Sequence, residues 1–245
     1  SPVPFLDAAC RSAKKLLCVT ATDTAPLCGA HLKAGIRNYD AFPLKTEYYN
    51  EVGVRILIGK IARELAKYDK SAKPLLSYAE QHYYRVYIKI EKGAAKADMA
   101  MKKLGFFIHC FNCFYRAPIP GITPRLPGKC PRCGKALKAG GILWLGDIEN
   151  KRFLSKALRE TEKRELGKKA QATKLLALCR DELPVFSYCD HHKLCMMLGI
   201  APGEIEELIA KLRSNGFEAT RTHFSGVGFK TNADMREIVD VIRET

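Results

Sequence analysis

The stretch His109-Cys110-Phe111-Asn112-Cys113, followed by Cys130-Pro131-Arg132-Cys133-Gly134, determines how the middle of this chain folds. It contains two C-x-x-C knuckles separated by sixteen residues. Each knuckle turns tightly enough to direct both of its sulfurs at one point, so four thiolates can surround one Zn²⁺ ion tetrahedrally. Gly134 suits a backbone that folds back toward the sulfurs, because glycine has no Cβ. We therefore predict structural zinc, in preference to disulfides, a redox motif or buried thiols, with the ligands Cys110, Cys113, Cys130 and Cys133.

An excess of positive charge surrounds these knuckles. The 245 residues include 41 Lys and Arg against 26 Asp and Glu, a formal charge of +15. Between Cys110 and Arg180 there are 16 Lys and Arg but only 5 Asp and Glu, so this segment carries a surplus of 11 charges and the other 174 residues carry 4. A solvated surface of mixed charge explains such a local excess poorly. We predict that the segment binds a polyanion, and specifically nucleic acid.

The overall composition indicates a globular protein with one large domain or two smaller ones, since 47% of the residues are hydrophobic. No run approaches the eighteen apolar residues of a membrane span, and no signal-peptide pattern is visible. We expect a soluble, cytoplasmic protein with no membrane partner. The remaining cysteines lack the spacing of a disulfide framework, which fits reduced thiols at Cys10, Cys18, Cys28, Cys179, Cys189 and Cys195.

The first hundred residues predict part of an α/β domain. Two prolines precede an Ala-rich helix over residues 5–15, and the apolar, partly β-branched run 16–22 is typical of a central parallel strand. A helix followed by a buried strand is half of a βαβ unit, so we expect the chain to begin in the middle of a domain. The later periodicities predict a long amphipathic helix over 47–67, a strand over 83–90, a helix over 93–104 and a strand over 105–109.

The second half of the chain predicts a different architecture. Pro and Gly exclude a long helix from the loop between the knuckles, a strand is expected over 140–146, and residues 150–179 are helical and basic. Asp190 is the predicted cap of a helix over 191–198, followed by a helix over 203–215, a strand over 218–224 and a helix over 234–243. Helix, short turn, helix and strand resembles a winged-helix order.

A second group of potential metal ligands lies in this region, at Cys189, His191, His192 and Cys195. On a single helix these side chains cannot all face one point, because neighbouring residues are about 100° apart. A helix start with exposed imidazoles and a buried thiol is the simpler interpretation, and the metal hypothesis stays open as the alternative.

Several segments, in order, resemble one family over nearly the whole chain. They are Ser1–Ala9, Val19–Gly29, Glu51–Leu57, His82–Val86, the two knuckles with Gly141–Trp144, and Thr222–Thr231. The family is the archaeal-type tRNA guanine-26 N2-dimethyltransferases. The resemblance implies two methyl transfers from S-adenosylmethionine to the guanine amine, with tRNA as partner. It implies an α/β fold: the second half of a class I, Rossmann-like methyltransferase domain, a zinc module with four cysteine ligands, and an α+β C-terminal domain with winged-helix-like order.

The resemblance also implies what lies outside the chain. In the family an Asp-Pro-Phe-Gly motif immediately precedes the position matched by Ser1, and the cofactor-binding strands lie further upstream. We therefore expect no catalytic residue in this chain, and a partner in the N-terminal half of the same protein, present in one polypeptide or as a separate chain. The expected domains are the methyltransferase half over 1–109, the zinc-ribbon module with a basic helical segment over 110–180, and a tRNA-contacting domain over 181–245.

The matched positions also imply contacts with substrate. Thr22, Asp23 and Thr24 fall at the carboxyl edge of the sheet, where they are expected to line the reaction cleft. A guanine in folded tRNA must leave its stack before it reacts, so phosphate contacts have to supply binding energy. We expect these contacts from the basic residues around the knuckles: Arg116, Arg125, Lys129, Arg132, Lys135 and Lys138.

A rival hypothesis from another class is a non-enzymatic nucleic-acid-binding regulator, built from a zinc ribbon and a winged-helix-like domain. The first hundred residues count against it, because such a regulator has no use for half of an α/β domain. Cofactor binding separates the two hypotheses: we expect none from this chain alone and binding by the longer protein.

Overall fold

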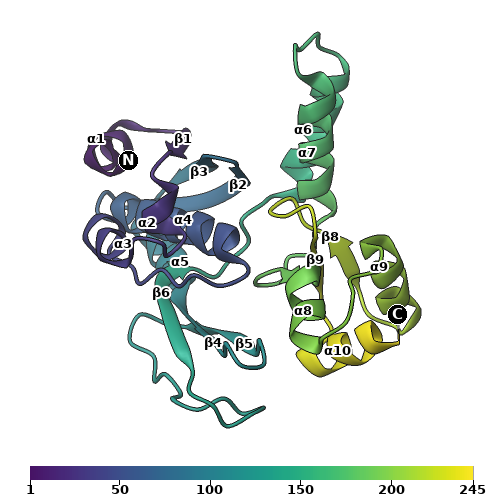
Figure 1. The fold of residues 1–245 in the computed structure, drawn as a ribbon. Helices are drawn as coiled ribbons and strands as arrows, with labels where there is room; N and C mark the ends of the chain where they lie inside the picture. Colours follow the sequence, from purple (N-terminus) through teal and green to yellow (C-terminus); the bar gives the residue numbers. More distant parts are fainter. Residues whose placement is uncertain (245) are drawn as a thin grey trace. The chain divides into compact units, whose positions relative to one another are not determined.

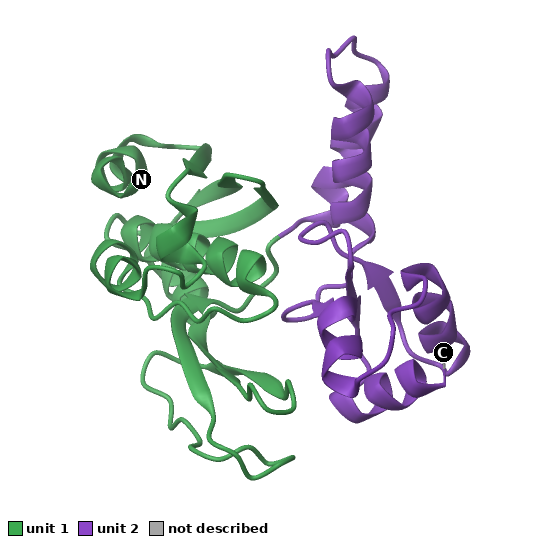
Figure 2. Cartoon of the chain, viewed as in Figure 1, with its two compact units in different colours: residues 1–148 green, residues 149–245 purple. Residues whose placement is uncertain are grey.

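The structure is a computed structural model that describes residues 1–244. It divides into two compact units, and Figure 2 shows unit 1, Ser1–Ile148, in green and unit 2, which begins at Glu149, in purple. Figure 1 labels the helices and strands of both. No helix of the described residues is both long enough and apolar enough to span a bilayer.

Unit 1 begins with a helix, a strand and a helical region that precede a β-hairpin. The elements are α1 (Val3–Ser12), β1 (Leu16–Ala21), α2 (Thr24–Leu27), α3 (Leu32–Tyr39), α4 (Tyr49–Ala66), β2 (Lys70–Glu80) and β3 (Tyr83–Lys92). The sheet order is β1-β3-β2, and β3 is antiparallel to both neighbours. The predicted helix and strand at the start are confirmed. Within residues 1–244 the partner of β1 is β3, which the β2–β3 hairpin places antiparallel beside it, and the parallel partner expected upstream of Ser1 stays a prediction.

A second sheet of unit 1 carries the two knuckles. Its elements, with the helix before them, are α5 (Ala94–Met101), β4 (Leu104–His109), β5 (Arg116–Pro120) and β6 (Lys138–Trp144). The order is β5-β4-β6, and both pairs are antiparallel. The strands predicted over 105–109 and 140–146 correspond to β4 and β6. Strand β5 was not predicted because it contains Pro118 and Pro120, which are tolerated since β5 is an edge strand.

Helix α4 packs against strands of both sheets, including β2 and β6. The sequence predicted an amphipathic helix here, but not all of its charged residues face solvent. Instead Glu51 and Arg55 are buried, with 1% and 3% of their surfaces exposed. The two side chains form an ion pair at 2.8 Å, and the Arg55 guanidinium also donates to the carbonyls of Trp144 and Gly146. The ion pair and the hydrogen bonds to the two carbonyls offset the free-energy cost of burying these charges. Helix α4 can therefore be enclosed on most of its sides.

Unit 2 contains a helical hairpin followed by a small α+β body. Its elements are α6 (Lys151–Glu162), α7 (Lys169–Asp181), β7 (Cys189–Asp190), α8 (His191–Leu198), α9 (Ile205–Ser214), β8 (Ala219–Arg221), β9 (Gly228–Thr231) and α10 (Met235–Arg243). The sheet order is β7-β9-β8, and both pairs are antiparallel. The helical segment predicted over 150–179 is two helices, which pack side by side (Figure 1).

Two helices of unit 2 begin at capping aspartates, of which Asp190 was predicted and Asp234 was not. The Asp190 carboxylate accepts the backbone N–H of Lys193 at 3.0 Å, which satisfies a donor at the start of α8. Asp234 caps α10 and forms a capping box with Glu237, in which each side chain accepts a backbone N–H of the other residue. The helices predicted over 191–198 and 234–243 are confirmed at these positions.

Candidate functional site

The four cysteines of the two knuckles lie between β4 and β6 in the chain, and their sulfurs come together in the fold. The Sγ atoms of Cys110 and Cys133 are 3.5 Å apart, those of Cys113 and Cys130 are 3.6 Å apart, and all four lie within 4.8 Å of one another. A tetrahedral zinc ion with Zn–S bonds of about 2.3 Å requires sulfurs about 3.8 Å apart. The four-cysteine cluster therefore fits a tetrahedral metal ion with little movement.

Both knuckles have the same backbone pattern. The Cys110 N–H donates to the carbonyl of Tyr115, and the Phe114 N–H donates to that of Cys110. The second knuckle repeats these two bonds between the equivalent residues Cys130, Gly134 and Lys135. Phe114 and Gly134 both have positive φ, of 56° and 72°, which turns the chain back toward the sulfurs. The predicted role of Gly134 is thus visible in the backbone, and Phe114 adopts the same turn without being glycine.

The environment of the sulfurs favours a bound cation. Burial raises the pKa of Cys113 to about 12, whereas a backbone hydrogen bond from Lys135 lowers the pKa of Cys133 to about 7. Without a metal ion these thiols do not all ionise at neutral pH. A divalent cation would stabilise four adjacent thiolates, because its positive charge offsets the free-energy cost of burying them and their repulsion of one another.

A cluster of polar side chains lies next to the first knuckle, and two of its members immediately precede α4 in the chain. The hydroxyl of Tyr48 lies 3.1 Å from Nδ1 of His109, and Glu47 accepts a hydrogen bond from Arg116 at 2.7 Å. Burial, with a further contribution from Arg116, lowers the pKa of His109 to about 3. The imidazole is therefore neutral, and its 3.7 Å approach to Glu47 is not an ion pair. This group fixes the end of β4 where Cys110 follows.

The six residues expected to contact tRNA have different environments. Arg116 is half-buried, pairs with Glu47 and lies over the ring of Tyr48, with 4.9 Å between its guanidinium carbon and the ring centroid. Arg132 is also half-buried, and one of its guanidinium nitrogens is enclosed without a hydrogen-bond partner. The other four are exposed in the loop between the knuckles or just after it, at Arg125, Lys129, Lys135 and Lys138.

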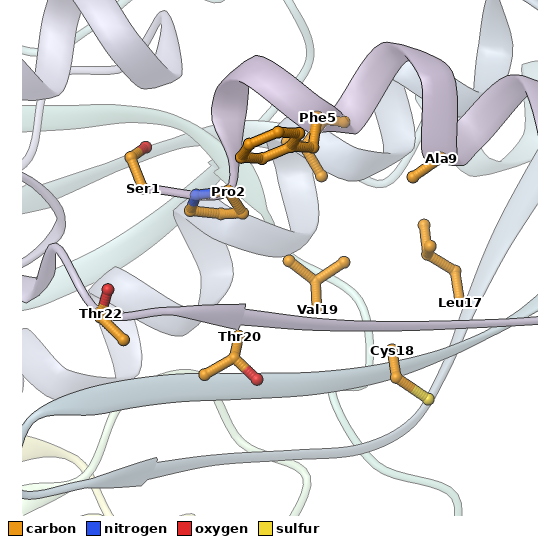
Figure 3. A pocket seen from close by; sticks show the side chains of 10 residues that line it. Ser1, Pro2, Phe5, Ala9, Leu17, Cys18, Val19, Thr20 and Thr22 are labelled. Carbon is orange, nitrogen blue, oxygen red and sulfur yellow. The ribbon is translucent and has the colours of Figure 1, made fainter.

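A cavity of about 340 Å³ lies between α1 and β1. Figure 3 shows Leu17 and Val19 on the side of β1 that faces α1, with Thr22 at one end of the cavity. Asp23 follows Thr22 at the carboxyl end of β1. One oxygen of its carboxylate accepts the Tyr39 hydroxyl at 2.8 Å, while the other is buried without a hydrogen-bond partner. Of the three residues expected to line a cleft, only Thr22 borders this cavity.

The ligand group proposed at Cys189, His191, His192 and Cys195 does not come together. The metal-competent clusters of residues 1–244 are the four-cysteine cluster and a group formed by Glu149, Cys179 and His223. His191 is buried and His192 is exposed, so the two imidazoles point in different directions.

His223 of the second cluster also belongs to a buried ion network of unit 2, with Glu182 and Lys230, that sequence reasoning missed. Nδ1 of His223 donates to Glu182 at 2.6 Å, and the other Glu182 oxygen lies 2.8 Å from Nζ of Lys230. Burial alone would lower the pKa of His223, but Glu182 and Cys179 outweigh it and raise this pKa well above its usual value. An imidazolium has no lone pair for a metal ion, so we assign the network a structural role. Its members are far apart in sequence, and no local spacing signals them.

Comparison with known proteins gives consistent results. The model of the N2,N2-dimethylguanosine tRNA methyltransferase family matches residues 1–243. The tRNA (guanine(26)-N(2))-dimethyltransferase of Methanosarcina barkeri is 47% identical over 243 residues, which cover 99% of this chain and 63% of that protein. The enzyme of the same name from Methanobrevibacter smithii is 44% identical over 247 residues, again covering 99% and 63%.

A solved structure agrees with the sequence relatives. It is described as Trm1 from Pyrococcus horikoshii in complex with S-adenosyl-L-methionine, and it matches 99% of this chain with a TM-score of 0.90 and 41% identity. The match covers 63% of that structure, so the chain spans less than two thirds of the length of each of these proteins. The family expected from the sequence is confirmed: the chain belongs to the N2,N2-dimethylguanosine tRNA methyltransferases.

Proposed function

We propose that this chain is part of an S-adenosylmethionine-dependent enzyme that dimethylates the N2 amine of guanine 26 in tRNA. The observation that carries the proposal is the family match over residues 1–243, together with relatives named for that activity at 44% and 47% identity. A non-enzymatic regulator would not require the α1, β1 and β2–β3 arrangement of unit 1. We place the protein in the cytoplasm, where its proposed substrate class is found.

The cofactor is assigned mainly to a segment that this chain does not contain. The relatives have 37% of their length outside the match, since 63% is covered. The cavity between α1 and β1 has a largely apolar lining and no carboxylate that could accept ribose hydroxyls. Its polar side chains are Ser1, Thr20, Thr22 and the weakly polar Cys18. These residues do not fit a complete S-adenosylmethionine site, so we expect this chain alone not to bind the cofactor.

The exposed edge of β1 is the proposed docking surface for the N-terminal half. In the described part of the chain β1 pairs with β3 alone, which leaves its other edge without a strand. Leu16 of β1 is 51% exposed, and Phe5, which is 71% exposed, lines the cavity between α1 and β1. A parallel strand added here would cover this apolar surface and extend the sheet. It would also bring a catalytic motif to the carboxyl end of β1, near Thr22, Asp23 and Thr24.

The four-cysteine cluster is proposed to bind zinc in a structural role. Four thiolates fill a tetrahedral coordination shell and leave no position for water or substrate. The zinc ion is therefore not expected to activate a water or substrate molecule. Zinc would instead fix the loop between the knuckles at both ends. This loop and the residues just after it present the exposed cations that we propose contact the tRNA backbone.

Unit 2 after residue 181 is proposed to be a winged-helix-like tRNA-contacting domain. The order strand, helix, helix, strand, strand and the sheet order β7-β9-β8 support this comparison. The division of the chain into domains at 109 and 180 remains our proposal alongside the two compact units.

A complementation experiment tests the proposed function. The chain is combined with the N-terminal segment of the Methanosarcina barkeri relative, and methyl transfer from labelled S-adenosylmethionine to a tRNA transcript is measured. We expect activity only with both pieces, and none when guanine 26 is replaced by adenosine. Complementation should fail when a charge is placed on the docking edge by Leu16→Asp, while Lys33→Asp on exposed α3 serves as control. Cofactor binding by this chain alone would contradict the assignment of the cofactor to the missing segment.

A salt titration tests the proposed tRNA contacts around the knuckles. Replacing Arg125, Lys129, Lys135 and Lys138 with Gln should weaken tRNA binding at 0.1 M salt and flatten the dependence of log K on log salt, by about one for each phosphate that is no longer neutralised. Arg116 is left unchanged, because its pairing with Glu47 supports the fold. An unchanged slope would refute these contacts.

A further inference from the structure

Helix α6 has a row of cations along one face. Arg152, Lys156, Arg159 and Lys163 follow the spacing i, i+4, i+7 and i+11, and all four are exposed. At about 100° per residue, these positions fall within an arc of about 60°. The row is about 16 Å long, given a rise of about 1.5 Å per residue. We call these four residues the α6 track.

The opposite face of α6 is its packing face. Leu154, Leu158 and Thr161 are buried, and each is displaced by two positions from a member of the track, which places the two rows about 200° apart. The main packing partner of α6 is α7, and the hairpin extends from the α+β body of unit 2 (Figure 2). The fold of unit 2 therefore directs the α6 track away from the helix that covers the packing face.

Most of the track has no acidic partner. Arg152, Lys156 and Arg159 form no ion pair with any described carboxylate, whereas Lys163 pairs with Glu160 at 3.0 Å. Residues 151–181 contain ten Lys and Arg against four Asp and Glu. An ordinary solvated helix face is usually a mixture of both signs with i, i+4 pairs. A row of unpaired cations is instead suited to a line of phosphates.

We propose that the α6 track binds the sugar-phosphate backbone of tRNA, as a second contact surface separate from the loop between the knuckles. This inference rests on the proposed function, which makes tRNA the polyanion. A lipid surface is disfavoured because amphipathic helices bind membranes by inserting an apolar face, and the apolar face of α6 is buried. Because the contacts are to phosphates, the track contributes affinity and orientation but no base specificity.

Charge-neutral substitution tests the track in the full chain. The triple variant Arg152→Gln, Lys156→Gln and Arg159→Gln is compared with the parent for binding to a labelled tRNA transcript between 50 and 300 mM salt. We expect binding about tenfold weaker or more at 0.1 M salt, and a slope of log K against log salt that is shallower by about two to three. Circular dichroism and melting temperature should match those of the parent, because the three side chains are exposed.

The matched control removes the same number of charges in unit 1, outside the segments proposed to contact tRNA. Lys33, Arg11 and Arg37 are also one lysine and two arginines, all exposed and without an ion pair to a described carboxylate. Their replacement with Gln should change the salt slope by less than about one. Equal weakening in both triple variants would show a general charge effect and overturn the track.

The remaining outcomes separate the track from the proposed function. A parent chain that binds no tRNA at any salt concentration contradicts both. A parent that binds tRNA, with a track variant that binds equally well, contradicts the track alone. Binding to phosphatidylserine vesicles that disappears in the track variant, while tRNA binding is kept, would show that the partner is a membrane and overturn the proposal.

Discussion

At the scale of single residues, each cysteine of the four-cysteine cluster supplies one bond of a tetrahedral shell. Cys110→Ser should reduce the zinc content from about one ion per chain and lower the melting temperature of unit 1 by about 5 °C or more. Trp144 is the only tryptophan, is buried and lies in unit 1, so its fluorescence follows unfolding of this unit. Cys18→Ser, at an exposed position outside the cluster, is the control. Full zinc content in the Cys110 variant would contradict the assignment.

His223 makes the stability of unit 2 depend on pH. The pKa of His223 in the folded state lies well above the unfolded value of about 6.5. At a pH between these two pKa values, His223 is protonated in the folded state and deprotonated in the unfolded state. The stabilisation by protonated His223 is therefore fully present below about pH 6.5 and is lost as pH rises toward the folded pKa, by up to about 1.4 kcal/mol per pH unit. Glu182 has a lowered pKa, so its contribution is lost in acid instead.

Pulse proteolysis in urea can measure this dependence, because it follows the fragments of each unit separately. Between pH 6.5 and 9 the free energy of unfolding of unit 2 should fall in the parent and stay nearly flat in His223→Gln, which starts less stable. The two curves should converge at high pH. Parallel curves for parent and variant would show that His223 does not titrate in this range.

At the scale of elements, α4 depends on a glycine for its close approach to β3. A Cβ at Gly53 would lie 2.4 Å from Cε2 of Tyr84, a side chain that is 1% exposed and hydrogen-bonded to Asn50. Gly53→Ala should therefore destabilise unit 1 by about 1 to 3 kcal/mol, although alanine is the better helix former. Trp144 fluorescence in urea measures this change. Gly128→Ala, also in unit 1, has open space around it and should be nearly neutral.

The sequence predicted elements whose signals are local. The spacing of Cys110, Cys113, Cys130 and Cys133 is such a signal, and the Asp190 cap of α8 is another. Strand β2 was not predicted, because Pro74 and a register shift interrupt its alternation. The burial of Arg55 and the network of Glu182, His223 and Lys230 were missed for another reason. The carbonyls of Trp144 and Gly146 that accept from Arg55, and the His223 and Lys230 partners of Glu182, lie far away in the chain, so these contacts exist only in the folded structure.

At the scale of the whole molecule, the chain divides after Ile148, so the four-cysteine cluster and the buried ion network belong to different compact units. Removal of zinc with 1,10-phenanthroline should therefore destabilise unit 1 and leave unit 2 nearly unchanged. Hydrogen exchange should accelerate in peptides covering β4, β5 and β6, with little change after residue 149. Equal acceleration in both units would show that their stabilities are coupled.

The cross-knuckle sulfur distances also have a consequence for handling the protein in air. The pairs Cys110–Cys133 and Cys113–Cys130, 3.5 and 3.6 Å apart, need a movement of only about 1.5 Å to reach a disulfide length of about 2.05 Å. Once the metal ion has left, an oxidant can take two electrons and two protons from either pair and link one knuckle to the other. The oxidised module would keep its loop closed but could no longer take up zinc, so metal loss becomes irreversible unless a reductant is present.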